Sequence, residues 1–276
     1  VVVKNEIKGI HIVKETADAI HLQAGAGEVW HDIVRHCVER DWGGIENLSL
    51  IPGTAGAAPM QNIGAYGVEI KDVLESVEAI DVYSGSTHVF QNADCQFGYR
   101  ESIFKQEAKG KYMITSITLR LTKNNHRFVA NYGAIHDTLK AFNHDTLSVK
   151  SISNAVIHIR KSKLPDPAVI GNAGSFFKNP SITQAKFDAL KKSYPQIPGF
   201  PGESPETTKV PAAWLIEQCG WKGKRFDKIG VNPLQPLVLV NYGGGEGKKI
   251  WELALQIQTS VKEKFNIELT PEVNII

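Results

Sequence analysis

The sequence predicts an α+β fold, in which strands and helices are mixed along a soluble globular chain. Some stretches are rich in β-branched apolar residues and predict strands, whereas others carry apolar residues at intervals of three and four and predict helices. These stretches do not follow a regular strand–helix–strand order, which favours α+β over a parallel α/β array. The chain has 276 residues, which is enough for one large domain or two medium ones.

The first elements are a pair of strands and an amphipathic helix. Strands are predicted at 10–13 and 19–22. The helix follows because apolar residues recur at helical spacing over Trp30, Ile33, Val34, Cys37 and Val38. Gly43-Gly44 is expected to end it, since glycine is common just beyond a helix C-terminus.

The remaining elements suggest a second domain. Further strands are predicted at 76–83, 87–90, 113–121, 174–178, 237–241 and 267–276. Further helices are predicted at 133–142, 149–163, 182–193, 211–219 and 248–264. Pro165-Asp166-Pro167 stops a helix and marks the expected boundary. The predicted divisions are therefore 1–164, 165–266 and a terminal strand over 267–276. Val1-Val2-Val3 is strand-like, and we expect the start to lie inside a longer protein.

Composition and simple motifs exclude several classes of function. The net charge of +2 argues against a protein that coats nucleic acid or an anionic membrane. Three widely spaced cysteines predict neither a disulfide framework nor a zinc site, and no metal site is expected. No apolar run is long enough to span a membrane. The segment 243–249 is rich in glycine, but it lacks the spacing and the Ser/Thr of a phosphate-binding loop.

Four segments are hard to explain by folding alone. The first is the glycine-rich stretch from Ile51 to Gly67, whose small residues would let a backbone approach a flat or anionic ligand. The others are Phe97-Gly98-Tyr99-Arg100-Glu101-Ser102-Ile103-Phe104, Gly171-Asn172-Ala173-Gly174-Ser175-Phe176-Phe177-Lys178-Asn179-Pro180 and Leu269-Thr270-Pro271-Glu272-Val273. Taken singly, each would more often be a turn, a surface charge or a packed loop. Their order along one chain favours a functional interpretation.

Together these segments resemble the UDP-N-acetylenolpyruvoylglucosamine reductase (MurB) family, from about Ile10 to Val273. Asn131-Tyr132-Gly133 is similar to the first, longer subtype, in which a tyrosine-bearing loop closes over the substrate. The resemblance implies a flavin-binding lobe of the vanillyl-alcohol-oxidase type over 1–164, a substrate domain over 165–266, and a terminal strand that returns to the active site. It further implies peptidoglycan precursor synthesis in a bacterial cytoplasm, by a protein expected to be a monomer.

The resemblance implies a reaction and three catalytic residues. NADPH would reduce FAD, which would in turn reduce UDP-N-acetylglucosamine enolpyruvate to UDP-N-acetylmuramate. Arg100 matches the arginine that stabilises the enolate, Ser175 the proton donor, and Glu272 the residue that assists at the enolate. A fixed cation suits this task, because preorganised charge is commonly the largest catalytic contribution.

The resemblance also implies binding residues. Those expected to contact FAD are Pro52, Gly53, Gly56, Ala57, Ala58, Gln61, Asn62, Gly64, Ala65, Gly67 and Arg160. Those expected to hold the UDP-sugar are Tyr132, Lys163 and Asn179, with Lys163 suited to a diphosphate as a point charge.

Two departures leave other interpretations open. The family's upstream Gly-Ser-Asn segment, which wraps the FAD pyrophosphate, has no counterpart here, so the FAD-binding lobe is expected to be incomplete. Ala57-Ala58 stands where some members have two serines, which leaves backbone amides as the phosphate donors. The alternatives are another FAD oxidoreductase of the same fold, or an inactive UDP-sugar-binding fragment.

Overall fold

The computed structural model describes residues 3–142 and 146–275, which form two compact units. The first unit is Val1–Arg160 and the second is Lys161–Ile276. The division falls in the last turn of α3 (Val149–Lys163), whereas the sequence-based boundary lies at 164/165. That boundary stays a prediction.

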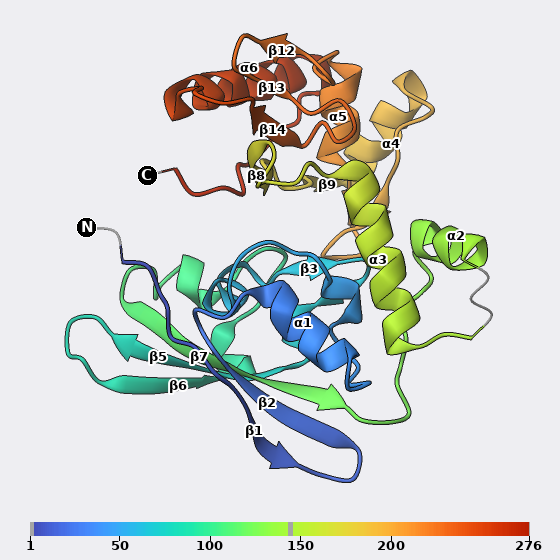
Figure 1. Cartoon of the computed structure of the whole chain (residues 1–276). Coiled ribbons are helices and arrows are strands. Elements are labelled where there is room, and N and C mark those ends of the chain that lie inside the picture. Colours follow the sequence, from blue (N-terminus) through green and yellow to red (C-terminus); the bar gives the residue numbers. More distant parts are fainter. Residues whose placement is uncertain (1–2, 143–145, 276) are drawn as a thin grey trace. The chain divides into compact units, whose positions relative to one another are not determined.

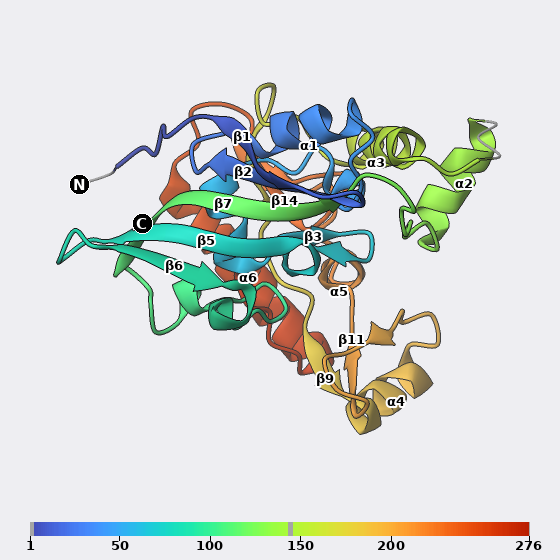
Figure 2. The same cartoon turned by 90° about the horizontal axis from the view of Figure 1, so that it is seen from below.

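A five-stranded antiparallel sheet is the frame of the first unit, in the order β1-β2-β7-β5-β6 (Figure 2). Its strands are β1 (Ile10–Glu15), β2 (Ala19–Gly25), β5 (Leu74–Asp81), β6 (Thr87–Gln91) and β7 (Tyr112–Thr122). The long β7 lies between β2 and β5, and its buried residues Ile117 and Leu119 pair with Ala24 and Leu22 of β2. These apolar cross-strand pairs fix the register of the sheet.

Helix α1 (Trp30–Val38) packs on one face of this sheet (Figure 1). Trp30, Ile33, Val34 and Cys37 are buried in the same core as the inward residues of β2, β5 and β7. The helical periodicity in the sequence is thus confirmed. The helix ends earlier than expected, because Asp41 takes a left-handed conformation (φ 55°) before Gly43-Gly44 is reached.

A second, smaller core of the first unit lies between α2 (Gly133–Ala141) and α3. Ile135 and Leu139 of α2 are buried against Ile152, Val156 and Ile159 of α3. The chain between α1 and β5 forms short turns and one small hairpin: η1 (Glu46–Leu48), η2 (Ala55–Ala57), η3 (Pro59–Gln61), β3 (Gly64–Ala65), β4 (Val68–Glu69) and η4 (Ile70–Asp72). Two more 3₁₀ turns, η5 (Asn92–Cys95) and η6 (Ile103–Lys105), follow β6.

The described part of the second unit forms two small sheets and three helices of its own around a separate core. One sheet has the order β12-β13-β14-β8, with β8 (Gly171–Ser175), β12 (Arg225–Phe226), β13 (Ile229–Val231) and β14 (Val238–Asn241). The other comprises β10 (Phe200–Pro201), β11 (Thr207–Lys209) and β9 (Ser181–Thr183). The helices are α4 (Gln184–Ser193), α5 (Ala212–Gln218) and α6 (Gly247–Phe265), and Leu253, Ile257 and Val261 of α6 face the core.

One predicted element is wrong. Residues 267–275 form no strand and make only an isolated bridge, between Pro271 and Phe177. Ile267 and Leu269 are buried, but they pack into the core of the second unit rather than into a sheet. Among the helices of residues 3–142 and 146–275, none is both long and apolar enough to cross a membrane.

Candidate functional site

The glycine-rich loop, residues 51–67, is fixed to the chain that follows β2. The amide of Ala55 donates to the Glu28 carbonyl at 2.8 Å, and that of Gly56 donates to the Ala26 carbonyl at 2.9 Å. A Cβ on Gly56 would lie only 2.7 Å from the Cβ of Ala26. Glycine is therefore required at position 56 so that the two segments can approach.

The next two amides of the loop also bond within the protein. The Ala57 amide donates to the Thr54 carbonyl at 3.0 Å, and the Ala58 amide donates to the Ala55 carbonyl at 3.2 Å. Both bonds belong to 3₁₀ turns. In this conformation the amides of Ala57 and Ala58 therefore already have partners within the loop.

Several small residues of the loop are exposed to solvent. Pro52, Gly53, Ala57 and Gly67 are exposed, whereas Ala55 and Ala58 are buried beneath them. Gly53 has φ 113°, and no atom lies within 4 Å of the place a Cβ would take. Gln61 and Ala65 are half-buried, at the end of η3 and in β3. This backbone is open to the close approach of a flat ligand, and the FAD contacts expected here stay a prediction.

Asn62 is the buried centre of the loop. Its backbone is left-handed (φ 43°), and its side-chain amide donates to the Glu69 carboxylate at 2.9 Å and to the Gly98 carbonyl at 3.0 Å. Its side-chain oxygen accepts from the Lys71 amide at 3.2 Å. Asn62, expected to contact FAD, thus joins the loop to the Phe97–Phe104 segment.

Arg100 is attached to the same loop. Its guanidinium donates to the Gly64 carbonyl at 2.6 Å and to the Asn62 carbonyl at 3.3 Å. The backbone of Arg100 is left-handed (φ 57°), and its guanidinium lies 5.3 Å from the centre of the Tyr99 ring. The candidate catalytic cation is therefore held at the edge of the candidate flavin loop, within the first unit.

Arg160, at the end of the first unit, contacts both ends of the loop region. Its Nε donates to the Leu50 carbonyl at 3.2 Å, and its side chain hydrogen-bonds that of Tyr66. Burial lowers the pKa of Arg160 and raises the pKa of Tyr66, while their mutual attraction opposes both shifts. Leu50 is left-handed (φ 58°), a conformation that costs roughly 1–2 kcal/mol for a residue with a Cβ.

Tyr132 lies beside this loop. It precedes α2, is 48% exposed, and meets the Tyr66 ring edge-on with centroids 6.0 Å apart. Its ring atoms are 3.8 Å from the place a Cβ on Gly67 would take. Tyr132 was predicted as a substrate contact, and its ring is available for one because it is half exposed.

Ser175 is the last residue of β8 in the second unit. It pairs with Val238 of β14 and is exposed. Gly174 before it has φ 74°, with no atom within 4 Å of a built Cβ. Phe176 and Phe177 after it are buried in the core, which anchors the strand end. The serine hydroxyl is thus presented next to open space by a fixed backbone.

Glu272 belongs to a segment that pairs with the residues after Ser175. Its amide donates to the Phe176 carbonyl at 2.8 Å, and the Lys178 amide donates to the Thr270 carbonyl at 2.9 Å. Figure 1 shows the C-terminal segment beside the end of β8. Within the second unit, two of the three candidate catalytic residues therefore lie on adjoining backbone.

The two remaining candidates of the second unit differ in their surroundings. Lys163 is exposed at the end of α3. Asn179 is half-buried, and its side-chain oxygen accepts from the Ala212 amide at 2.9 Å, at the start of α5. Asn179 therefore stabilises the helix N-terminus in addition to its predicted role with substrate.

Sequence reasoning missed three residues that shape the loop. The Nδ1 atom of His31 accepts from the Leu50 amide at 2.9 Å. Asn47 is buried and donates to the carbonyls of Tyr66 at 3.0 Å and Val129 at 2.8 Å. The side chain of Tyr66 hydrogen-bonds that of Arg160. No spacing in the sequence indicates these bonds, because each joins positions that only the fold brings together.

Comparisons with known proteins agree with these observations. Residues 166–276 match the family model described as UDP-N-acetylenolpyruvoylglucosamine reductase, C-terminal domain, and residues 1–91 match that of an FAD binding domain. UDP-N-acetylenolpyruvoylglucosamine reductase of Amoebophilus asiaticus is 54% identical over 100% of this chain and 80% of its own length. The enzyme of that name from Flavobacterium johnsoniae is 48% identical over 100% of this chain and 81% of its own.

The chain belongs to the UDP-N-acetylenolpyruvoylglucosamine reductase family. A crystal structure of UDP-N-acetylenolpyruvylglucosamine reductase (MurB) from Thermus caldophilus has the same fold, with a TM-score of 0.61 and 23% identity. The match covers 91% of this chain and 71% of that one. The predicted α+β class, with an FAD-binding region followed by the family's C-terminal domain, is confirmed.

The residues of the first unit fit the flavin that this family membership implies. The open side of Gly53, where a Cβ would enter empty space instead of protein, is the observation that supports this fit. Pro52, Ala57 and Gly67 of the same loop are also small and exposed, and Arg160 supplies a half-buried cation that bonds the Leu50 carbonyl. Among the described residues, no group of His, Cys, Asp and Glu could hold a metal ion.

Proposed function

We propose that this protein reduces UDP-N-acetylglucosamine enolpyruvate to UDP-N-acetylmuramate, with NADPH as reductant and FAD as the redox cofactor. The observation that carries the proposal is the backbone pairing that sets Glu272 against Phe176, next to Ser175. In this reaction a proton must reach a carbon whose negative charge is conjugated with a carboxylate. A serine and a glutamate at adjoining backbone positions suit that step.

FAD, when bound, supplies hydride transfer, and the loop residues 52–67 with Arg160 would hold it. The role of the chain is then to stabilise charge and deliver a proton. The alkene of the substrate gains a hydride at its terminal carbon, and the electron pair moves toward the carboxylate as an enolate. Arg100 would stabilise this negative charge, because its guanidinium is already fixed by two carbonyls before substrate arrives.

The second alkene carbon must then gain a proton. The Ser175 hydroxyl would donate it, with the O–H bond breaking as the new C–H bond forms, and the exposed serine would regain a proton from solvent. Glu272 would act beside it at the enolate. The product has gained one hydride and one proton, which balances the conversion of an enolpyruvyl group to a lactyl group.

Three further residues would hold the UDP-sugar. Lys163 would meet the diphosphate as an exposed cation, Tyr132 would cover the substrate from beside the loop, and Asn179 would contact it from the start of α5. A bacterial cytoplasmic location and a monomeric state stay predictions from the sequence.

The proposal is tested with the purified full chain. We expect FAD to bind and give visible absorption bands that shift on addition of the enolpyruvyl substrate, and we expect NADPH oxidation to depend on that substrate. Failure to bind FAD, or NADPH oxidation that consumes oxygen at the same rate without substrate, would overturn it. The second result would favour an oxidase of the same fold.

A further inference from the structure

Leu50 is a strained residue at the entrance of the glycine-rich loop. It is left-handed (φ 58°) although it carries a side chain, and its backbone lies just before Ile51, Pro52 and Gly53. Residues persist in this conformation only where their surroundings hold them, and such positions are often linked to function. What holds Leu50 therefore determines the direction in which the chain enters the loop.

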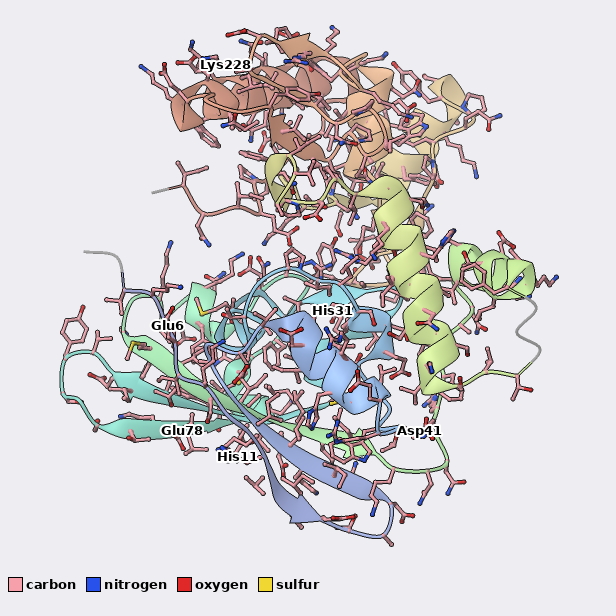
Figure 3. All side chains as sticks on the ribbon, in the orientation of Figure 1. Glu6, His11, His31, Asp41, Glu78 and Lys228 are labelled. Atoms are coloured by element: carbon pink, nitrogen blue, oxygen red, sulfur yellow. The ribbon has the colours of Figure 1, made fainter. Side chains whose placement is uncertain are left out.

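Leu50 is held from both sides of its backbone by side chains. The Leu50 amide donates to Nδ1 of His31 at 2.9 Å, and the Leu50 carbonyl accepts from Nε of Arg160 at 3.2 Å. A peptide N–H can only donate, so Nδ1 of His31 must carry a lone pair and not a proton. His31 lies in the first turn of α1, where it is labelled in Figure 3.

The same turn of α1 also holds Gly53, at the other end of the loop entrance, Ile51–Gly53. The amide of Trp30 donates to the Gly53 carbonyl at 3.0 Å, and the Trp30 indole donates to the Leu48 carbonyl at 3.0 Å. Pro52 restricts Ile51 before it to extended conformations. Once Leu50 and Gly53 are both fixed, little freedom remains between them, and the open side of Gly53 has a defined orientation.

We propose that His31 is a positioning residue, which acts through Leu50 to set the conformation of the loop entrance, Ile51–Gly53, for flavin binding. The identity of the ligand rests on the proposed function above. His31 acts on FAD affinity only through the backbone of the entrance. Removing its acceptor releases the Leu50 amide and lets the entrance sample other orientations.

Three variants separate this role from a general contribution to folding. His31→Ala removes the acceptor. His31→Asn retains one, because the side-chain oxygen of asparagine occupies nearly the place of Nδ1. His36→Ala is the matched control, since His36 is a half-buried histidine of the same helix that packs on Trp42 with ring centroids 5.8 Å apart. It lies outside the contacts that hold the loop entrance.

The first measurement needs no flavin. In ¹⁵N-labelled wild type we expect a scalar coupling across the hydrogen bond between the Leu50 amide and Nδ1 of His31. We expect the Leu50 amide to exchange faster and the Gly53 signal to shift in His31→Ala, with both restored in His31→Asn. An unchanged Gly53 signal in His31→Ala would overturn the proposal, whatever the enzyme binds.

The second measurement is FAD affinity by absorbance titration of the same proteins. We expect the Kd for FAD to rise about tenfold in His31→Ala and to return to within about threefold of wild type in His31→Asn. His36→Ala should bind as wild type does. Equal weakening in His31→Asn and His31→Ala would overturn the positioning role, because the asparagine retains the acceptor. If wild type binds no FAD while the amide results are as expected, the proposed function fails and the entrance-setting role of His31 stands.

Discussion

The guanidinium of Arg100 donates a hydrogen bond to the carbonyl of Gly64 at 2.6 Å, so the candidate catalytic cation is also a tether of the glycine-rich loop. A second hydrogen bond joins the guanidinium to the Asn62 carbonyl, so Arg100 is attached to the loop at two points. A residue with both tasks should affect cofactor binding and chemistry together, whereas a purely catalytic arginine would affect chemistry alone.

Arg100→Met is therefore expected to lower turnover by about 10²–10³, the usual effect of removing one electrostatic stabiliser, and to weaken FAD binding as well. Arg100→Lys retains the positive charge but lacks the planar guanidinium that donates to two carbonyls at once. It should recover part of the turnover. Steady-state NADPH oxidation and FAD titration check both effects. An unchanged Kd for FAD in Arg100→Met would show that the loop does not depend on this tether.

Ser175→Ala is expected to reduce substrate turnover by about 10²–10⁴, the typical contribution of a positioned proton donor. Reduction of bound flavin by NADPH should stay at the wild-type rate, because it needs no proton from Ser175. Stopped-flow absorbance separates the two half-reactions. Ser181→Ala, at an exposed serine of the same unit, is the control and should behave as wild type. Wild-type turnover in Ser175→Ala would exclude the assigned role.

Gly56→Ala should destabilise the flavin-free protein by about 1–3 kcal/mol, the usual cost of inserting a methyl group into a packed contact. The added Cβ would lie 2.7 Å from the Cβ of Ala26. Ala26→Gly in the same chain removes that atom and should recover part of the loss. Urea denaturation followed by circular dichroism measures the difference. A Gly56→Ala variant as stable as wild type would mean that the two segments can separate without cost.

Glu46→Gln should change the pH dependence of stability. Glu46 is 4% exposed, and burial raises the pKa of its carboxyl in the folded protein above the ordinary value of 4.5. Since the folded state holds the proton more tightly, wild-type stability falls as pH rises from 4.5 through the folded pKa. The glutamine variant lacks this loss.

We therefore expect Glu46→Gln to melt at a higher temperature than wild type at neutral pH, with the difference shrinking toward zero below about pH 4.5. Thermal melts across this range check it. A lower melting temperature at neutral pH would mean that attraction to His126 and the bond from the Gly44 amide outweigh the cost of burying the carboxylate.

The longer elements were predictable because their signals are local. The apolar spacing from Trp30 to Cys37 and the long periodic stretch of α6 needed only neighbouring residues, and both helices are found. The strand expected over 267–276 is wrong because its apolar pattern depends on distant parts of the chain. Its apolar residues are buried by packing against a helical core, and a short sequence cannot distinguish that from burial in a sheet.

For the candidate site, the sequence named residues, whose roles stay predictions, but not their contacts. Resemblance to a family named Arg100, Ser175 and Glu272. It could not reveal that Arg100 bonds the loop, or that the amides of Ala57 and Ala58 already have partners within the loop. Strands β9 and β11 were missed because each has only three residues, which is too short for an alternating pattern to show.

The burial of Asn47 limits how this protein can be produced. Asn47-Leu48-Ser49 has the spelling of an N-glycosylation site, and the asparagine side chain donates to Tyr66 and Val129 while Ser49 is fully buried. In a secretory host the glycan would be added to the nascent chain, before these bonds form. A sugar on Asn47 would occupy the donor nitrogen and keep the chain from closing over it. Secreted yeast or insect-cell material should therefore be misfolded unless Ser49 is first replaced by alanine, whereas bacterial cytoplasmic expression avoids the problem.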